Sequence, residues 1–518
     1  MARIRTVVSL VALVATLVSI LWLARLEAGG PSRTELSLPG GIPATLYLPV
    51  DAAAGSDRVS IGRPPAVVLA HGFASDQAGM SILARALTQA GYAVLTLDFR
   101  GHGANRNPFT RSRSRKDSLY QDMRSAVDFL RTSPDVDGAR ISVMGHSMGA
   151  GAALEYAQSD PALDASVMIS GGWRATGPNR PSNALFIYGA GDPERIRKRS
   201  ARITAELAGL PGLRPGAIAG SFAEGTAVAQ VEVARADHIT ILSSQYAARH
   251  IIDWLDDCYG VERGTFFLRA DPRLRTALLG LLAFLLVLPG LGDALGRLSP
   301  KLAERPARGT PGRLGLVALA LVATLPLVAV GDPSRILPLV VGNVVVTHLF
   351  AAGLAIFAGL LLRDKLDASA IRAGAMASSG AALLGLVAVY FLLTPFGAVL
   401  HGLGLTPERG VLALGAGVLV APFQLVFHHL LRRGSTAVAA VSSLLGRVVI
   451  VVVLVVAVNA GVLSGVVMLM LPVLVGLFVL FEVLSSAIYA RSRNYVVPAL
   501  LESGWLAWTF AAVLPVAL

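Results

Sequence analysis

The stretch ISVMGHSMGAGAALEYAQ, residues 141–158, decides how the first half of this 518-residue chain folds. It begins with a short apolar run that is typical of a buried strand, and it ends in the strong helix formers of residues 150–158. Between them lies Gly145-His146-Ser147-Met148-Gly149, whose small residues let a strand turn sharply into a helix. Ser147 is therefore predicted to stand above the end of a strand, at a helix N-terminus whose dipole favours negative charge.

The sequence on both sides of this stretch alternates between strand and helix patterns. Helical patterns cover residues 80–91 and 117–131. Short apolar runs bounded by turn residues predict buried strands, namely PAVVLA (65–70), YAVLTLDF (92–99), ISVM (141–144), SVMIS (166–170), ALFIYG (184–189) and AQVEVA (229–234). This alternation predicts the α/β class, with a mainly parallel sheet covered by helices on both faces.

In this context the Gly-x-Ser-x-Gly motif resembles the nucleophile elbow of the α/β-hydrolase superfamily. The resemblance covers about residues 35–257 and implies a serine hydrolase in which Ser147 is the nucleophile. Only residues 171–183 separate two of the strands at the point where many relatives insert a lid domain. The site is therefore expected to be open, as in dienelactone-hydrolase and prolyl-oligopeptidase-like cores.

The resemblance also implies the other catalytic residues, because the family orders them as serine, acid and histidine. Asp192 follows the strand ALFIYG, where the family places its acid, and His238 follows the last strand, where it places its base. His71-Gly72-Phe73 resembles the family's oxyanion loop, which implies an oxyanion hole built from the backbone N–H groups of Phe73 and Met148.

We expect a reaction through an acyl-enzyme, with carboxylic esters of lipids or of the cell envelope as the favoured substrates. The fold does not determine the substrate, so peptidase, thioesterase and acyltransferase activities stay open for the same triad. A non-catalytic module on this fold is disfavoured, because the serine, acid, base and both elbow glycines are all present.

The second half has a different composition. The chain is 54% hydrophobic with a mean hydropathy of +0.63, and its apolar residues concentrate at the N-terminus and beyond residue 276. We expect an N-terminal signal anchor at 1–30, an α/β-hydrolase domain at 35–258 and an all-α multi-pass membrane domain of about eight helices at 270–518. A cleaved signal peptide is the alternative for the first segment. The candidate spans of the membrane domain are 276–291, 314–331, 336–362, 373–399, 409–431, 446–463, 465–490 and 499–517.

The distribution of basic residues predicts the orientation of these spans. Alternate loops are rich in them, with Arg297, Lys301, Arg305, Arg308 and Arg313, then Arg363, Lys365 and Arg372, then Arg432 and Arg433, then Arg491 and Arg493. The opposing loops carry only Arg335 and Arg409, although Arg269, Arg273 and Arg275 break the pattern. The sequence thus predicts a cell-membrane protein whose hydrolase domain lies on the extracytoplasmic side.

The net charge of +12 does not indicate nucleic acid as a partner, because the basic residues mostly flank apolar spans. The single cysteine, Cys258, excludes an intrachain disulfide and a cysteine-cluster metal site. The sequence contains no Walker loop, dinucleotide fingerprint, H-E-x-x-H motif or calcium loop in a recognisable context. We therefore expect no metal and no cofactor.

Two further groups of residues have more than one interpretation. Basic residues follow two strands of the hydrolase domain, at Arg106, Arg111, Arg113, Arg115 and Lys116, and at Arg195, Arg197, Lys198, Arg199 and Arg202. They are either solvated side chains or a contact for anionic lipid headgroups or an acidic substrate. Polar groups also interrupt the apolar spans, at Asn343, His348, Gln424, His428, His429, Asn459 and Glu482. They favour helix–helix hydrogen bonds, with a transporter that carries an accessory hydrolase domain as the alternative function.

Overall fold

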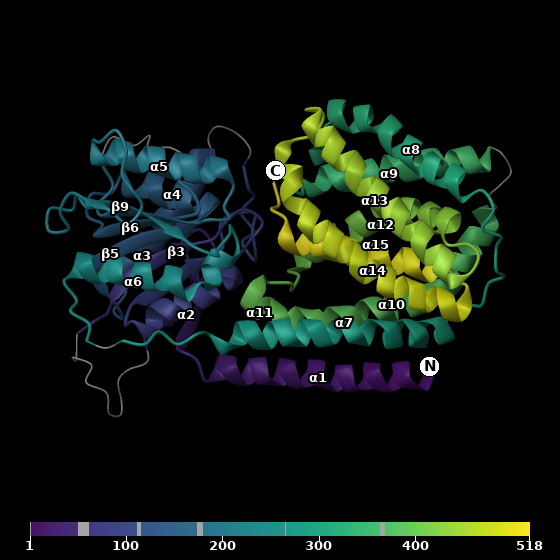
Figure 1. Ribbon diagram of the computed structural model, residues 1–518, viewed down its shortest axis with the longest axis horizontal. Helices are drawn as coiled ribbons and strands as arrows, with labels where there is room; N and C mark the ends of the chain where they lie inside the picture. Colours follow the sequence, from purple (N-terminus) through teal and green to yellow (C-terminus); the bar gives the residue numbers. More distant parts are fainter. Residues whose placement is uncertain are drawn as a thin grey trace. The chain divides into compact units, whose positions relative to one another are not determined.

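The structure is a computed structural model that describes residues 2–49, 62–110, 115–172, 180–264, 266–362 and 368–517. The chain forms two compact units (Figure 1). The α/β unit comprises Leu23–Thr276, Gly397–Gly402 and Pro515–Leu518. The helical unit comprises Met1–Trp22, Ala277–Phe396 and Leu403–Leu514.

A nine-stranded sheet runs through the α/β unit in the order β1-β2-β4-β3-β5-β6-β7-β9-β8. The six strands from β4 to β9 in that order are parallel, whereas β1, β2 and β8 pair antiparallel at the two edges. The strands are β1 (Ser32–Leu38), β2 (Ile42–Leu48), β3 (Pro65–Ala70), β4 (Ala93–Leu97), β5 (Asp137–His146), β6 (Ala165–Ile169), β7 (Ala184–Gly189), β8 (Ile218–Ala219) and β9 (Val228–Val233). The predicted mainly parallel sheet is confirmed, and the strands that the sequence analysis missed are the three antiparallel ones, β1, β2 and β8.

Helices cover both faces of the sheet, as predicted (Figure 1). On one face, α2 (Ser81–Gln89) and α6 (Gln245–Tyr259) pack Leu87 and Ile252 into an apolar cluster with the strand residues beneath them. On the other face, α4 (Met148–Ala157) and α5 (Glu194–Ala208) pack Leu154 and Ile203 around Phe186. The helix α3 (Arg115–Thr132) lies beside α4, and two short 3-10 helices are η1 (Gln77–Met80) and η2 (Thr240–Ser243).

The α/β unit is not continuous in sequence. The ranges Gly397–Gly402 and Pro515–Leu518 lie within the region expected to be a membrane domain, and yet they belong to the α/β unit. The first of them contains the short helix α11 (Gly397–Leu400). Neither segment carries a sequence pattern that predicts this, because the contacts that place it join residues more than 300 positions apart.

A buried group of charges joins two helix ends to the α/β unit. The Arg273 side chain is 1% exposed and donates to Asp271 at 2.6 Å and to Glu27. Arg85 on α2 lies 3.4 Å from Asp271 and 3.6 Å from Glu27. Glu27 lies in the last turn of α1 (Ala2–Ala28), and Arg273 lies in the first turn of α7 (Pro272–Leu298). Because the four charges compensate each other, both helix ends are fixed to α2.

The helical unit consists of long apolar helices. They are most of α1 and α7, with α8 (Thr310–Val330), α9 (Gly342–Leu361), α10 (Ala368–Leu393), α12 (Pro407–Leu431), α13 (Thr436–Asn459), α14 (Leu471–Ser492) and α15 (Val496–Val513). Within the described ranges, nine helices are long and apolar enough to cross a membrane. Apolar side chains on their surfaces are exposed, for example Val330 at 90% and Leu414 at 73%, which suits contact with lipid tails.

The helix bounds differ from the predicted spans at several places; for example, α9 begins at Gly342 rather than at 336, and α13 spans Thr436–Asn459 rather than 446–463. The helix α7 continues through Pro289 to Leu298, so it is longer than the predicted span 276–291. The helix α15 ends at Val513, before the end of the predicted span 499–517, and the last residues join the α/β unit.

Replacing Arg273 by methionine tests the buried group of charges. The change leaves Glu27 and Asp271 with less compensating charge, and we expect a loss of about 3 kcal/mol in the free energy of unfolding. The matched control is Arg297→Met, because Arg297 forms an exposed pair with Asp293, and such pairs contribute only ~0.5 kcal/mol. Thermal unfolding of the detergent-purified protein measures both. Equal unfolding temperatures for the two variants would contradict the assignment.

Candidate active site

The backbone at Ser147 is strained as the motif predicts. Ser147 has φ 52° and ψ −110°, a conformation that an L-residue adopts only under constraint, and α4 begins at the next residue. A Cβ on Gly145 would lie 2.2 Å from the carbonyl oxygen of Gly149, and one on Gly149 would lie 2.5 Å from that of His71. Only glycine at these two positions permits the strand, the turn and the helix to approach this closely.

Three residues from different strand ends meet at this turn. The Nε2 atom of His238 lies 3.0 Å from Oγ of Ser147, and its Nδ1 atom lies 2.6 Å from Oδ1 of Asp192. The three residues come from the chain after β5, β7 and β9, whose carboxyl ends share one edge of the sheet. The structure therefore brings together all three residues that the resemblance indicated, in the order serine, histidine, acid.

The second carboxylate oxygen of Asp192 has its own donors. It accepts from Ser170 Oγ at 2.6 Å and from the Gly189 N–H at 2.8 Å. Burial opposes ionisation, but the hydrogen bonds from His238, Ser170 and Gly189 outweigh it and lower the pKa of Asp192. Asp192 is thus held as a carboxylate facing His238. The sequence analysis missed Ser170, which follows β6 and has no motif of its own.

Two buried histidines support the site without being part of the triad. Burial lowers the pKa of His146 to about 3, and its Nε2 donates to the backbone carbonyl of His238 at 2.7 Å. Burial likewise lowers the pKa of His71 to about 4, and its Nε2 accepts from the Phe99 N–H at 3.0 Å. Both rings are therefore neutral at pH 7, and they hold the loops that carry His238 and the residues after β3.

The loop His71-Gly72-Phe73 lies against the nucleophile. A Cβ on Gly72 would be 3.3 Å from the Cβ of Ser147, so the loop passes directly beside the serine. Met148 is the first residue of α4, and its backbone N–H is one of those that no intrahelical bond uses. The oxyanion hole of Phe73 and Met148 is compatible with these positions and stays a prediction.

Within the described residues, the predicted basic cluster on α5 reaches this site at one point, because Nε of Arg197 donates to the backbone carbonyl of Asp192 at 3.2 Å. Arg195, Arg197, Lys198, Arg199 and Arg202 lie along α5, where Lys198 pairs with Glu194 at 2.7 Å and Arg202 with Glu206 at 3.5 Å. Arg106 is exposed, residues 111–114 lie outside the described residues, and so do the side chains of Arg115 and Lys116. The stretch 173–179, where a lid would be inserted, is also outside them.

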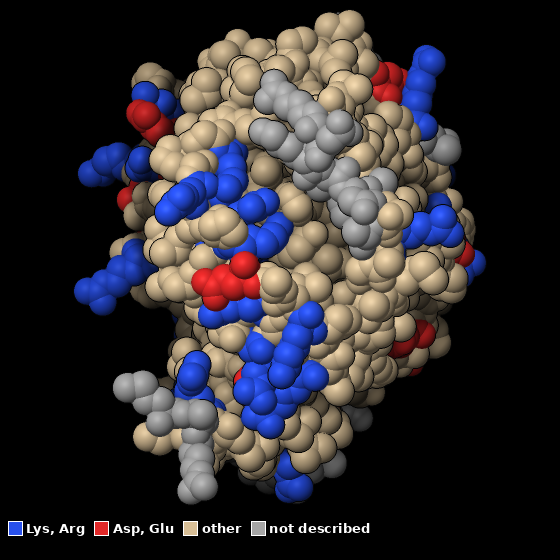
Figure 2. Space-filling model, turned by 90° about the vertical axis from the view of Figure 1, so that its right-hand side faces the viewer, with Lys and Arg blue, Asp and Glu red and all other residues tan. Residues whose placement is uncertain are grey.

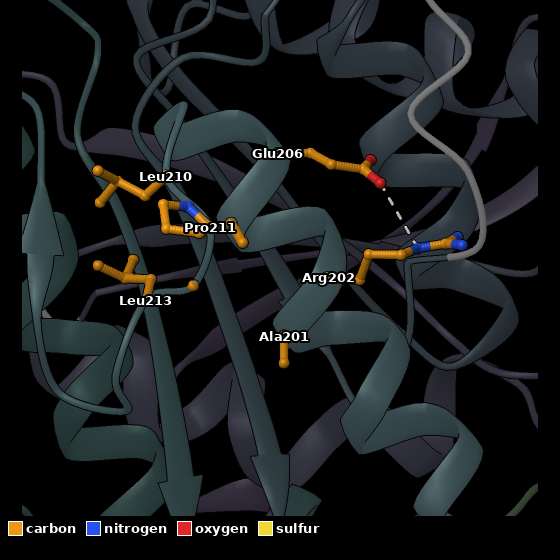
Figure 3. A pocket seen from close by; sticks show the side chains of 8 residues that line it. Ala201, Arg202, Glu206, Leu210, Pro211 and Leu213 are labelled. Atoms are coloured by element: carbon orange, nitrogen blue, oxygen red, sulfur yellow. Dashed lines mark ion pairs between the residues drawn. The ribbon is translucent and has the colours of Figure 1, made fainter.

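A hollow lined by α5 and the following loop is separate from the triad (Figure 3). It is lined by Ala201, Arg202, Ala205, Glu206, Leu210, Pro211, Gly212 and Leu213. Asp192 precedes the other end of this 15-residue helix, and at ~1.5 Å per residue the two places lie on the order of 15 Å apart. None of the three triad residues lines the hollow.

In the helical unit, several of the predicted polar residues belong to one buried network of charges. Glu482 on α14 accepts from Arg432 at 2.9 Å and from Arg447 at 3.4 Å. Arg447 also donates at 2.8 Å to Glu502 on α15, and Glu502 lies 3.1 Å from His428 on α12. The two arginines and two glutamates balance in charge, which favours the predicted role in joining helices. The sequence analysis missed Arg447 and Glu502, although each interrupts an apolar run.

The other predicted polar residues of the spans bond mostly to backbone. His348 Nε2 donates to the Leu321 carbonyl at 2.7 Å, and Asn459 donates to the Val455 carbonyl at 2.8 Å. His429 accepts from Arg305 at 3.0 Å. No group of three or more His, Cys, Asp or Glu side chains that could hold a metal ion occurs in the described ranges.

Comparison with known proteins identifies the fold of the α/β unit. Residues 64–190 match the family described as "Serine aminopeptidase, S33", a range that includes Ser147 and ends just before Asp192. Together with the sheet order and the elbow, this match shows an α/β-hydrolase fold.

Three relatives match parts of the chain. An uncharacterized protein of Mycobacterium tuberculosis is 33% identical over 169 residues, which are 31% of this chain and 58% of that protein. The bis(hydroxyethyl) terephthalate hydrolase of Streptomyces coelicolor is 27% identical over 229 residues, which are 43% and 64% of the two chains. Cutinase 2 of Thermobifida cellulosilytica is 30% identical over 105 residues, which are 20% and 38%. The chain thus spans less than two thirds of each of these relatives.

Replacing His146 by glutamine tests the buried neutral histidine. An ordinary histidine pKa near 6.5 in the unfolded chain and about 3 in the folded protein means that the unfolded state binds more protons below pH 7. Stability therefore falls as the pH drops through 6.5, by about 2 kcal/mol from this residue at pH 5. We expect His146→Gln to lose less stability than the wild type between pH 7 and pH 5. The half-buried His250→Gln is the control, and thermal unfolding at both pH values is the measurement. Parallel losses in wild type and His146→Gln would contradict the assignment.

Proposed function

We propose that this protein is a membrane-bound serine hydrolase that cleaves carboxylic esters through Ser147, His238 and Asp192. The observation that carries the proposal is the hydrogen-bonded chain from Ser147 Oγ through His238 to Asp192. Its support is the strained turn at Ser147, which holds the hydroxyl at the carboxyl edge of the sheet, where His238 is only 24% exposed.

The geometry assigns one role to each residue. His238 Nε2 accepts the Ser147 proton while Oγ attacks the carbonyl carbon of the ester, and Asp192 stabilises the imidazolium that forms. The negative oxygen of the tetrahedral intermediate faces the N–H groups of Phe73 and Met148. Collapse expels the alcohol, which takes the proton from His238 and leaves an acyl group on Ser147. Water then attacks this acyl group with His238 as base, and the carboxylic acid leaves.

Esters are favoured over amides as the substrates because of the names of the relatives that match the chain. Two of the proteins that match the chain are named as a terephthalate ester hydrolase and a cutinase, while the family description refers to an aminopeptidase. Within this class, we propose lipid or cell-envelope esters, because the catalytic unit is continuous in sequence with helices suited to a membrane.

We also propose that the α/β unit lies on the extracytoplasmic side of the cell membrane. Within the helical unit, hydrogen bonds join the basic loops to each other, from Leu302 to Ser492 at 2.9 Å and from Gly434 to Arg305 at 2.8 Å. The described basic loops around Arg305, Arg433 and Arg493 therefore lie together at one end of this unit, and Figure 2 shows Lys and Arg side chains gathered in groups on one face. The positive-inside rule assigns that end to the cytoplasm.

Labelling with a fluorophosphonate probe tests the triad. We expect the purified wild type to label, whereas Ser147→Ala should not label at all. His238→Ala and Asp192→Asn should label at a rate lower by on the order of 10³-fold or more. The first change removes the base of the serine, and the second removes the carboxylate that orients this base. His250→Ala is the control, since His250 lies on α6 and makes an edge-on contact with the Tyr246 ring. The rates at which the wild type releases carboxylic acid from ester substrates and from peptide substrates then distinguish an esterase from a peptidase. A folded wild type that does not label would end the proposal.

Cysteine labelling tests the orientation. In a Cys258→Ser background, Arg214→Cys places a thiol on an exposed loop of the α/β unit, and Lys301→Cys places one on an exposed basic loop. A membrane-impermeant maleimide added to intact spheroplasts should modify the first thiol, and it should reach the second only after the membrane is permeabilised. The reverse pattern would place the α/β unit in the cytoplasm.

A further inference from the structure

The segment Gly397–Gly402 lies in sequence between two apolar helices, α10 and α12, and yet it packs within the α/β unit. Its contacts concentrate on the chain that follows β3. Ser81 Oγ donates to the Ala398 carbonyl at 3.4 Å, and a Cβ on Gly79 would lie 3.4 Å from the Leu400 carbonyl oxygen. The segment therefore covers η1 and the start of α2.

His401 binds the loop that carries the proposed oxyanion-hole residue. Its Nε2 donates to the carbonyl oxygen of Ala74 at 3.1 Å, and its Nδ1 lies 3.3 Å from Oδ2 of Asp76. The side chain is 17% exposed. Ala74 directly follows Phe73, so the imidazole holds the carbonyl one residue beyond the N–H that would face the oxyanion.

Asp76 is bound from both sides. Its Oδ2 accepts from the Gly402 N–H at 2.7 Å, while its Oδ1 accepts from the Ala78 N–H at 3.0 Å and from the Gly79 N–H at 3.3 Å. A Cβ on Gly402 would lie 2.4 Å from Oδ2, so only glycine allows this close approach. One buried carboxylate thus joins the loop, the N-terminus of η1 and the segment Gly397–Gly402.

The oxyanion loop needs such external support because its backbone is strained. Ala74 has φ 55°, which costs ~1–3 kcal/mol unless the surroundings hold it. His71 secures the start of the loop from inside the sheet edge, through the Phe99 N–H. His401 and Asp76 secure its end. The Phe73 N–H lies between these two supports, so its direction depends on the support at the start of the loop and on the support at its end.

A second segment supports the same loop through a side chain. Val516 pairs with the chain near β4, since its N–H donates to Gly101 at 2.8 Å and its carbonyl accepts from Phe109 at 2.8 Å. The Phe109 ring lies 6.3 Å from the Phe73 ring, in an edge-on arrangement. His401 and Asp76 therefore hold the backbone that follows Phe73, and Phe109 contacts its ring.

We propose that His401 is a positioning residue for hydrolysis, and that Gly397–Gly402 completes the oxyanion side of the active site. The inference rests on the proposed function, because it assigns His401 a role in that reaction. His401 does not touch the reacting atoms. It keeps the Phe73 N–H aimed at the place where negative charge develops, and misplacing a single oxyanion donor costs on the order of 100-fold in rate.

The test compares full-length variants in detergent. Three quantities are measured, namely the rate at which a fluorophosphonate modifies Ser147, kcat and KM for p-nitrophenyl butyrate, and hydrogen exchange in peptides covering residues 71–80. For His401→Ala we expect labelling and kcat to fall about 10-fold or more while KM stays unchanged, with faster exchange in the loop. His401→Gln keeps an N–H for the Ala74 carbonyl and should recover part of the loss.

The control is His250→Ala, because this histidine lies on α6 against Tyr246, outside the segment and the loop, and its replacement should leave all three quantities at their wild-type values. If His401→Ala does not fold, the same measurements are made on His401→Gln and on Gly402→Ala. The new methyl group of Gly402→Ala presses on Asp76. Wild-type labelling, kcat and exchange in the His401 variants would overturn the inference. A wild type that never labels overturns the proposed function instead. In that case, hydrogen exchange in residues 71–80 still tests whether His401 supports the loop, and unchanged exchange in His401→Ala would show that it does not.

Discussion

The close approach of three backbone segments at Ser147 is the constraint on which the rest of the α/β unit depends. The strand β5, the helix α4 and the loop after β3 meet with so little space that a methyl group on Gly145 or Gly149 would overlap a carbonyl oxygen. This approach holds Ser147 at φ 52°. The strain is maintained because β5 lies in the middle of a parallel sheet whose pairing leaves it no freedom to relax.

The electrostatic arrangement follows from this geometry. Asp192 is held ionised by three donors, while His71 and His146 are kept neutral by burial. His238 is therefore the histidine that pairs with a carboxylate and a hydroxyl at once. The buried neutral rings do different work, because they bind backbone carbonyl and N–H groups and so keep the loops of the site in place.

The α/β unit is held together by contacts between distant parts of the sequence. Arg273 and Glu27 join the ends of α7 and α1 to α2, and His401 joins a segment after α10 to the loop after β3. A hydrolase core that relied only on residues 35–258 would lack these contacts. The α/β unit is thus built from segments that lie before, between and after the apolar helices in sequence.

The sequence by itself determined the parallel sheet, the turn at Ser147 and the number of apolar helices, because each depends on local periodicity and on glycine at fixed positions. The resemblance to the α/β-hydrolase superfamily also indicated Asp192 and His238, which follow the strands where that family places its acid and its base. The roles of Ser170, His146 and His401, and the pairing of Arg447 with Glu502, were decided only by the tertiary structure. These residues act through partners far away in the chain, and no local pattern records which distant carbonyl or carboxylate a side chain will meet.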